Sequence, residues 1–155
     1  MKAFTKTALV LAFGLVASTS FAGEIKDTEV NARNAYNEAS GSDSKALQHI
    51  GVTFGSGKIN NSYIYADYAR NVASGSGAVA HQDIGVADVG GKLDNVRVYA
   101  TNAKNTASGS YSEADQQIGK ATFGTIQNVS IYADNAQNVA SGYRSKAEQK
   151  IGVVE

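Results

Sequence analysis

The stretch SKAEQKIG, at Ser145–Gly152, is the last of four related segments of eight residues. The earlier ones are SKALQHIG at 44–51, AVAHQDIG at 78–85 and SEADQQIG at 112–119. Alternate positions keep serine or alanine, then alanine, glutamine and isoleucine, whereas the residues between them change freely in charge and size. A period of two is typical of a β-strand with one packed and one solvated face, because successive side chains point to opposite sides. A helix would instead keep residues three and four apart.

These segments belong to a longer internal repeat. Ala-Ser-Gly recurs at 39–41, 73–75, 107–109 and 140–142, and Ile-Gly recurs at 50–51, 84–85, 118–119 and 151–152. Both series are spaced by 34, 34 and 33 residues. Repeats with a fixed period stack so that each copy contacts only its neighbours. We therefore predict a single repeat domain over residues 23–155, with copies at about 30–63, 64–97, 98–130 and 131–155.

Each copy is expected to contain a strand, a tight turn and a second strand. The first strand reads Ala-x-Asn-x-Ala-x-Gly from Ala35, Ala69, Ala103 and Ala136. Serine, glycine and two variable residues then have the composition of a turn. A third, weaker strand is expected at Ile59, Leu93 and Ile126 and onward to Ile64, Val98 and Ile131, with a bulge or corner near Asp67, Thr101 and Asp134. This pattern predicts an all-β fold, a β-solenoid of stacked β-arch rungs built from four repeats of about 34 residues.

A helix is the alternative for the segment YADNAQNVASG at 132–142. Ala133, Ala136, Val139 and Ala140 would share one helical face. Asparagine, the β-branched residues and the glycine disfavour that alternative.

The first 22 residues have the features of a secretory signal peptide. A short basic head, residues 1–6, precedes the apolar segment 8–16, and Ser20-Phe21-Ala22 ends in a small residue. The apolar segment is too short to cross a bilayer as a helix, so the sequence predicts secretion without a membrane span.

Composition excludes several classes of function. Without Lys2 and Lys6 of the leader, 12 of the 14 basic residues remain against 14 acidic ones. This slightly acidic balance argues against a nucleic-acid partner, because such partners bind basic surfaces. The chain has no cysteine, which excludes disulfides and cysteine metal sites, and no proline, which is typical of a backbone that is hydrogen-bonded nearly throughout.

The residue types that every copy keeps are those whose side chains can pair with an identical side chain in the next copy of a stack. If each copy is one rung, each asparagine or glutamine amide can donate to the carbonyl of the rung below, and tyrosines can stack in the same way. The predicted structural ladders are Asn37, Asn71, Asn105 and Asn138; Gln48, Gln82, Gln116 and Gln149; Ile50, Ile84, Ile118 and Ile151; and Tyr65, Tyr99 and Tyr132.

The two ends of the stack have no recognisable cap in the sequence. The last copy stops at KIGVVE, residues 150–155, still inside the strand pattern. Solenoids usually carry atypical terminal repeats, because an end rung leaves strand edges unpaired. We therefore expect end-to-end polymerisation by strand addition.

The motifs resemble repeats of secreted bacterial functional amyloids. The pattern Gly-x-x-Ser-x-Ala-x-Gln at 41–48, 109–116 and 142–149 resembles curli subunits, and Asn-x-Ala-Ser-Gly at 37–41 and its equivalents resembles Fap-type fibre repeats. The resemblance covers nearly all of residues 23–155, although the period of 34 is longer than that of curli. It implies a fibre-forming, matrix-associated extracellular protein.

No catalytic, cofactor or metal residues are predicted. His49 and His81 both lie on the free face, but later copies have Gln117 and Lys150 at the position of His49, so solvated surface is the expectation. The carboxylates, including Asp67, Asp83, Glu113, Asp115 and Asp134, are scattered over free positions and favour no catalytic pair.

The sequence thus predicts a non-enzymatic subunit of an extracellular bacterial fibre that supports a biofilm matrix or surface adhesion. Its expected partners are further copies of itself, a related fibre subunit or nucleator, and an outer-membrane secretion channel. The alternative is a monomeric secreted β-solenoid that binds carbohydrate or ice, and an enzyme with an unrecognised site is the third reading.

Overall fold

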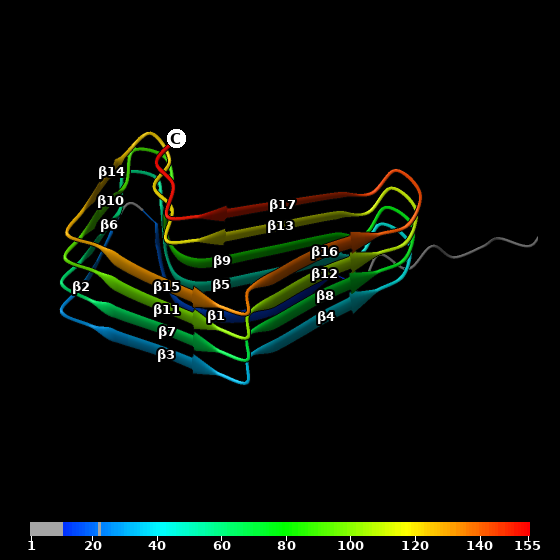
Figure 1. The fold of residues 1–155 in the computed structure, drawn as a ribbon, viewed down its shortest axis with the longest axis horizontal. Helices are drawn as coiled ribbons and strands as arrows, with labels where there is room; N and C mark the ends of the chain where they lie inside the picture. The colour runs from blue at the N-terminus through cyan, green and yellow to red at the C-terminus, as the bar shows by residue number, and fades with distance from the viewer. Residues whose placement is uncertain (1–10, 22) are drawn as a thin grey trace, which may run out of the picture.

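The computed structural model describes residues 11–21 and 23–155, and the side chains of residues 23–155. The chain forms a β-solenoid of about four turns, each of roughly 34 residues, and the described residues contain no helix (Figure 1). The all-β solenoid predicted from the repeat is therefore confirmed.

Four parallel sheets form the walls of the solenoid, and each sheet takes one strand from every turn. Sheet A contains β1 (Leu11–Phe21), β5 (Lys45–Phe54), β9 (Val79–Ala87), β13 (Glu113–Ile118) and β17 (Lys146–Ile151). Sheet B contains β2 (Glu24–Lys26), β6 (Lys58–Asn60), β10 (Lys92–Asp94) and β14 (Thr125–Gln127). Sheet C contains β3 (Glu29–Arg33), β7 (Tyr63–Asp67), β11 (Arg97–Thr101) and β15 (Ser130–Asp134). Sheet D contains β4 (Tyr36–Ser40), β8 (Arg70–Ser74), β12 (Lys104–Ser108) and β16 (Gln137–Ser141).

The register places equivalent residues of successive copies side by side. Ala107, for example, pairs with Ala73 of the preceding turn and Ala140 of the following one. Because every pair in sheets B, C and D is formed in this way, each side chain of an inner turn lies between its own counterparts.

Single residues in the left-handed conformation make the corners of each turn. The third strand expected from the sequence is in fact two strands, one in sheet B and one in sheet C, and that expectation is corrected here. The break falls at Asp27, Asn61, Asn95 and Asn128, and the corner after sheet C at Asn34, Tyr68, Asn102 and Asn135. Asparagine and aspartate adopt positive φ at lower cost than other residues with a Cβ, which explains their recurrence here.

The tight turn between sheets D and A requires glycine. Gly109 has a φ of 121°, and a Cβ there would lie 2.1 Å from the carbonyl oxygen of Gly75 in the preceding turn. Gly85, beside Ile84 within β9, has a φ of 64° and would place a Cβ 2.7 Å from Cγ2 of Val98. The glycine of the Ala-Ser-Gly repeat is therefore required because two backbones approach closely, and the glycine of the Ile-Gly repeat because a core side chain lies against it.

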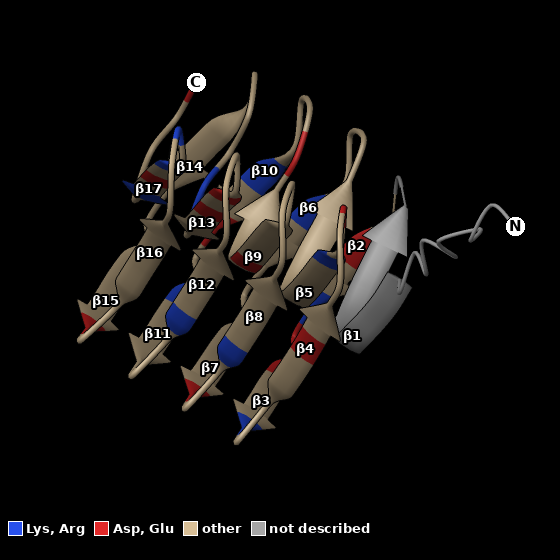
Figure 2. Cartoon of the chain, turned by 90° about the vertical axis from the view of Figure 1, so that its right-hand side faces the viewer, with Lys and Arg blue, Asp and Glu red and all other residues tan. Residues whose placement is uncertain are grey.

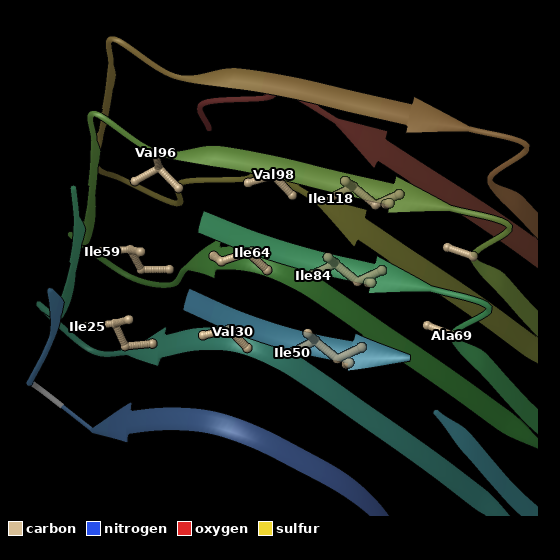
Figure 3. Close-up of a cluster of buried hydrophobic side chains, with 14 of the residues drawn as sticks. Ile25, Val30, Ile50, Ile59, Ile64, Ala69, Ile84, Val96, Val98 and Ile118 are labelled. Carbon is tan, nitrogen blue, oxygen red and sulfur yellow. The ribbon is translucent and has the colours of Figure 1, made fainter. Parts of the chain in front are cut away.

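Two cores fill the interior. The wider core lies between sheets A, B and C and contains isoleucine, leucine and valine; in Figure 3, Ile50, Ile84 and Ile118 form one column beside another that contains Ile64 and Val98. The thinner core lies between sheets A and D, and its members are Ala39, Ala46, Ala73, Ala78, Ala80, Ala107 and Ala114. Small side chains there let the two sheets approach closely.

Replacing Gly109 with alanine should destabilise the solenoid strongly. The new Cβ would meet the Gly75 carbonyl at 2.1 Å in a backbone conformation that alanine rarely adopts. We expect the free energy of unfolding to fall by about 3–4 kcal/mol, measured by urea denaturation followed by circular dichroism. Gly90→Ala is the matched control, because its φ is also positive but the nearest atom, Oγ of Ser56, is 3.7 Å away; it should cost only about 1–2 kcal/mol. Equal losses would contradict a requirement for close approach.

Candidate self-assembly interface

The four conserved asparagines form a continuous ladder through the thin core. The Nδ2 group of Asn37 donates to Oδ1 of Asn71 at 2.8 Å, and Asn71 donates to Asn105 at 2.9 Å. Asn105 in turn donates to Asn138 at 2.9 Å. The first three asparagines are buried, so each amide replaces the hydrogen bonds to water that burial removes.

The asparagine ladder also ties sheet D to sheet A. Nδ2 of Asn71 lies 2.9 Å from the carbonyl oxygen of Ala46 and 3.0 Å from that of His81. These carbonyls of the facing sheet fix the position of the nitrogen, so each asparagine donates to the following turn. The predicted hydrogen bond, from each amide to the turn below, therefore has the wrong direction for the asparagines.

The glutamines form a second ladder with the opposite direction. Nε2 of Gln116 donates to Oε1 of Gln82 at 2.6 Å, and Gln82 donates to Gln48 in the same way. Gln149 donates to Gln116. The Gln82 amide also reaches the carbonyl oxygen of Ala69 at 3.1 Å, so this ladder too connects two walls of the solenoid.

Isoleucine and tyrosine complete the stacked columns. Ile50, Ile84 and Ile118 are fully buried, one above another. Tyr65 and Tyr99 stack on the outer face of sheet C, with ring centroids 5.0 Å apart and planes 7° from parallel. Tyr132 continues this column at 6.2 Å from Tyr99, with its ring tilted by 46°.

The C-terminal end of the stack is open. Ile151 is 42% exposed, whereas its three counterparts are fully buried. Ile126 and Ile131 are likewise only partly buried, although they belong to the wide core. The strands β14 to β17 pair with the preceding turn only, so within residues 23–155 no strand covers their outer edges. The core side chains and the strand edges of this last turn are therefore exposed at the end of the stack.

The first turn is more enclosed than the last. Val30 and Ala32 are 3% exposed and Asn37 is 5% exposed. The backbone of β1 pairs with β5 and lies close to β3 and β4, so it covers part of this end. Of the predicted signal peptide, residues 1–10 and 22 lie outside the described residues, and residues 11–21 form β1.

Histidines and carboxylates gather on the outer face of sheet A. Oδ2 of Asp83 lies 3.1 Å from Nδ1 of His49 and 2.8 Å from Nε2 of His81, and Nδ1 of His81 lies 3.1 Å from Oδ2 of Asp115. The sequence analysis placed Asp83 on a solvated face, but it is only 4% exposed, because the two histidines enclose it. His49 and His81 were also predicted to be solvated, and they are half-buried. The prediction of a solvated surface is therefore wrong for these three residues.

The electrostatics of this cluster follow from its geometry. Both ring nitrogens of His81 face carboxylate oxygens. Burial alone would lower the pKa of His81, but hydrogen bonds to Asp115 and Asp83 raise it to about 10. Burial would likewise raise the pKa of Asp83, yet the hydrogen bonds from His49 and His81 hold it below its usual range.

Other charged residues lie on the outer faces of the strands, and a groove lies at one corner of the solenoid. Figure 2 shows acidic and basic residues together on β17, where Lys146, Glu148 and Lys150 form ion pairs. Among the other carboxylates named from the sequence, Asp67 accepts a hydrogen bond from Thr101 at 2.8 Å, and Glu113 lies 3.9 Å from Lys146. Along the corner between sheets C and D runs a groove of about 420 Å³ lined by Asn34, Tyr36, Tyr68, Arg70, Asn102 and Lys104, among others.

Comparison with protein-family models, with curated proteins and with solved structures finds no match to this chain. The likeness to curli and Fap repeats therefore rests on the repeat letters alone. The described part of the chain has no helix with the length and hydropathy needed to cross a bilayer.

Two adjacent glutamines test the assignment of faces. Gln116 is fully buried in the ladder, whereas Gln117 lies on the outer face and donates to Asp115 at 3.0 Å. Gln116→Leu should lower the free energy of unfolding by about 2–3 kcal/mol, because it removes the donor to the buried Oε1 of Gln82 and the acceptor for Nε2 of Gln149. Gln117→Leu should cost less than about 1 kcal/mol. Urea denaturation measures both, and equal losses would mean that the faces are reversed.

Proposed function

We propose that this protein is a structural subunit of an extracellular bacterial fibre, which grows by stacking the N-terminal turn of one molecule on the C-terminal turn of the next. The observation that carries the proposal is the open end formed by β14 to β17, where core residues such as Ile151 lose the cover that their counterparts have. Exposed parallel strand edges of this kind are templates for strand addition.

The direction of the ladders supports head-to-tail stacking. At the open end, Oε1 of Gln149 accepts no hydrogen bond from the described residues, and Nδ2 of Asn138 has no further asparagine above it. A second molecule would bring Nε2 of its Gln48 and Oδ1 of its Asn37 to these atoms. Each end therefore offers what the other lacks, and both ladders would continue without a change of direction.

Removal of the leader would expose a second stacking surface at the N-terminal end. In the described structure β1 occupies the edge of sheet A beside β5. If a signal peptidase removes residues 1–22, as the sequence predicts, that edge becomes available to the last turn of another molecule. Export and exposure of the second stacking surface would then occur together, which would keep the protein monomeric before secretion.

Secretion into a matrix or onto the cell surface is part of the same proposal. It rests on the leader features and on the resemblance to curli-like and Fap-like repeats. A related nucleating subunit and an outer-membrane channel are the further partners that this proposal implies.

A monomeric binding module is the second candidate. The groove lined by Tyr36, Tyr68, Arg70 and the asparagines of the corner offers aromatic faces and amide groups, the surface chemistry that suits carbohydrate. In that function the ends would stay unpaired and a glycan would bind along the side of the solenoid.

The chain without residues 1–22 should form fibres that bind thioflavin T, sediment and give a diffraction reflection near about 4.8 Å along the fibre axis. The full chain should assemble more slowly, because β1 covers one stacking end. A stable monomer at high concentration, with both forms behaving alike, would contradict fibre formation and favour the binding module.

A charge at the open end should block growth. Ile151→Lys should reduce the rate of elongation at least about tenfold, because the ammonium group would be buried against the next molecule. Val139→Lys is the matched control: Val139 is 41% exposed and Ile151 42%, but Val139 points away from the interior. Seeded thioflavin T kinetics measure both variants, and similar rates for the two would place the growing surface elsewhere.

A further inference from the structure

One cluster on the outer face of sheet A is built differently from the rest of that face. The register brings His49 of β5 beside Asp83 of β9, and His81 of β9 beside Asp115 of β13. The four side chains therefore come from three successive turns, and two copies contribute histidine. The third and fourth copies have glutamine, glutamate and lysine at the corresponding positions, so the cluster occurs once in the described chain.

The possible ligand atoms of this cluster lie close together. Nδ1 of His49 and Nε2 of His81 lie 3.1 and 2.8 Å from Oδ2 of Asp83, and one ligand atom from each of the three residues lies within 4.8 Å of the other two. Two ligands of a tetrahedral zinc ion, each at about 2.0–2.1 Å from the metal, are separated by roughly 3.3 Å. The observed separations from Asp83 are within about 0.5 Å of that spacing.

Asp83 carries an oxygen that the protein leaves without a partner. Its side chain is only 4% exposed on a face that is otherwise half-buried or solvated, and Oδ1 is buried without a hydrogen bond from the described residues. Buried carboxylate oxygens are normally satisfied. The ring of Phe54 lies against that of His49, with centroids 5.3 Å apart and planes at 83°.

We propose that His49, His81 and Asp83 bind one divalent transition-metal ion of the zinc class. Two imidazole nitrogens and a carboxylate suit Zn²⁺, Cu²⁺ or Ni²⁺, whereas Ca²⁺ and Mg²⁺ prefer sites made only of oxygen. On binding, Nε2 of His81 would release its proton and His49 would carry its proton on Nε2 rather than Nδ1, so that both facing nitrogens are free to coordinate the ion. The negative carboxylate of Asp83 would be the third ligand. Water would complete the coordination on the half-exposed side.

Asp115 acts as a positioning residue for this site. It accepts a hydrogen bond from Nδ1 of His81, which leaves Nε2 as the atom that faces Asp83. Asp115 is itself held by Nε2 of Gln117 at 3.0 Å. Metal-binding histidines commonly donate their second ring nitrogen to a carboxylate in this way, because the hydrogen bond fixes the tautomer and the ring orientation.

Zinc titration of the untagged full chain tests the site. Calorimetry and competition with a chromogenic chelator should show one Zn²⁺ bound per molecule, and X-ray absorption should show two imidazole ligands. Asp83→Asn and His49→Gln should each weaken binding at least about tenfold, and Asp115→Asn should weaken it about 10- to 100-fold. The thermal midpoint of the unsubstituted protein should rise with zinc, because the ion binds the folded state.

Glu148→Gln is the matched control, since Glu148 is the residue of the fourth copy at the position of His81. It should leave zinc affinity unchanged. Circular dichroism of each variant shows whether the solenoid is intact, and His49→Gln keeps the test decisive if Asp83→Asn does not fold, because His49 lies nearer the surface than Asp83. Equal affinity in the unsubstituted protein and the folded His49 variant, or binding without a fixed stoichiometry, would overturn the proposal.

Discussion

The whole molecule depends on parallel, in-register pairing between consecutive turns. Each turn lies against its own copy, so every inner residue must be able to pack on its counterpart above and below. Alanine and isoleucine meet this condition by shape, and asparagine and glutamine meet it because an amide carries both a donor and an acceptor. Glycine meets it where the backbones of two turns approach to contact, as at Gly75 and Gly109.

The same condition makes the two ends of the stack special. An inner turn is satisfied from both sides, but the last turn has neighbours on one side only, and its isoleucines are the exposed members of otherwise buried columns. The opposite directions of the asparagine and glutamine ladders give the stack a polarity, so the two ends differ in hydrogen-bonding chemistry although they share a shape.

The outer face obeys a different rule. Its residues are free to vary between copies, so it can carry features that occur once. The cluster around Asp83 is such a feature: the register pairs His49 with Asp83 and His81 with Asp115, and His81 stands two residues before Asp83 on the same strand. If the ion is bound there, it would link consecutive turns through side chains as the ladders link them through amides.

The repeat of 34 residues and its period of two were sufficient to predict the solenoid, the turn at Ala-Ser-Gly and the inward direction of Asn71 and Gln82, because stacking imposes the same requirement on every copy. Tertiary structure alone decided the rest. The sheet B and sheet C strands separate at Asn61 because one left-handed residue bends the backbone, and no alternation of letters reports a φ angle. Asp83 is buried because His49 of the preceding turn and His81 of its own strand both lie against it, a contact that depends on side-chain rotamers, which a repeat pattern does not encode.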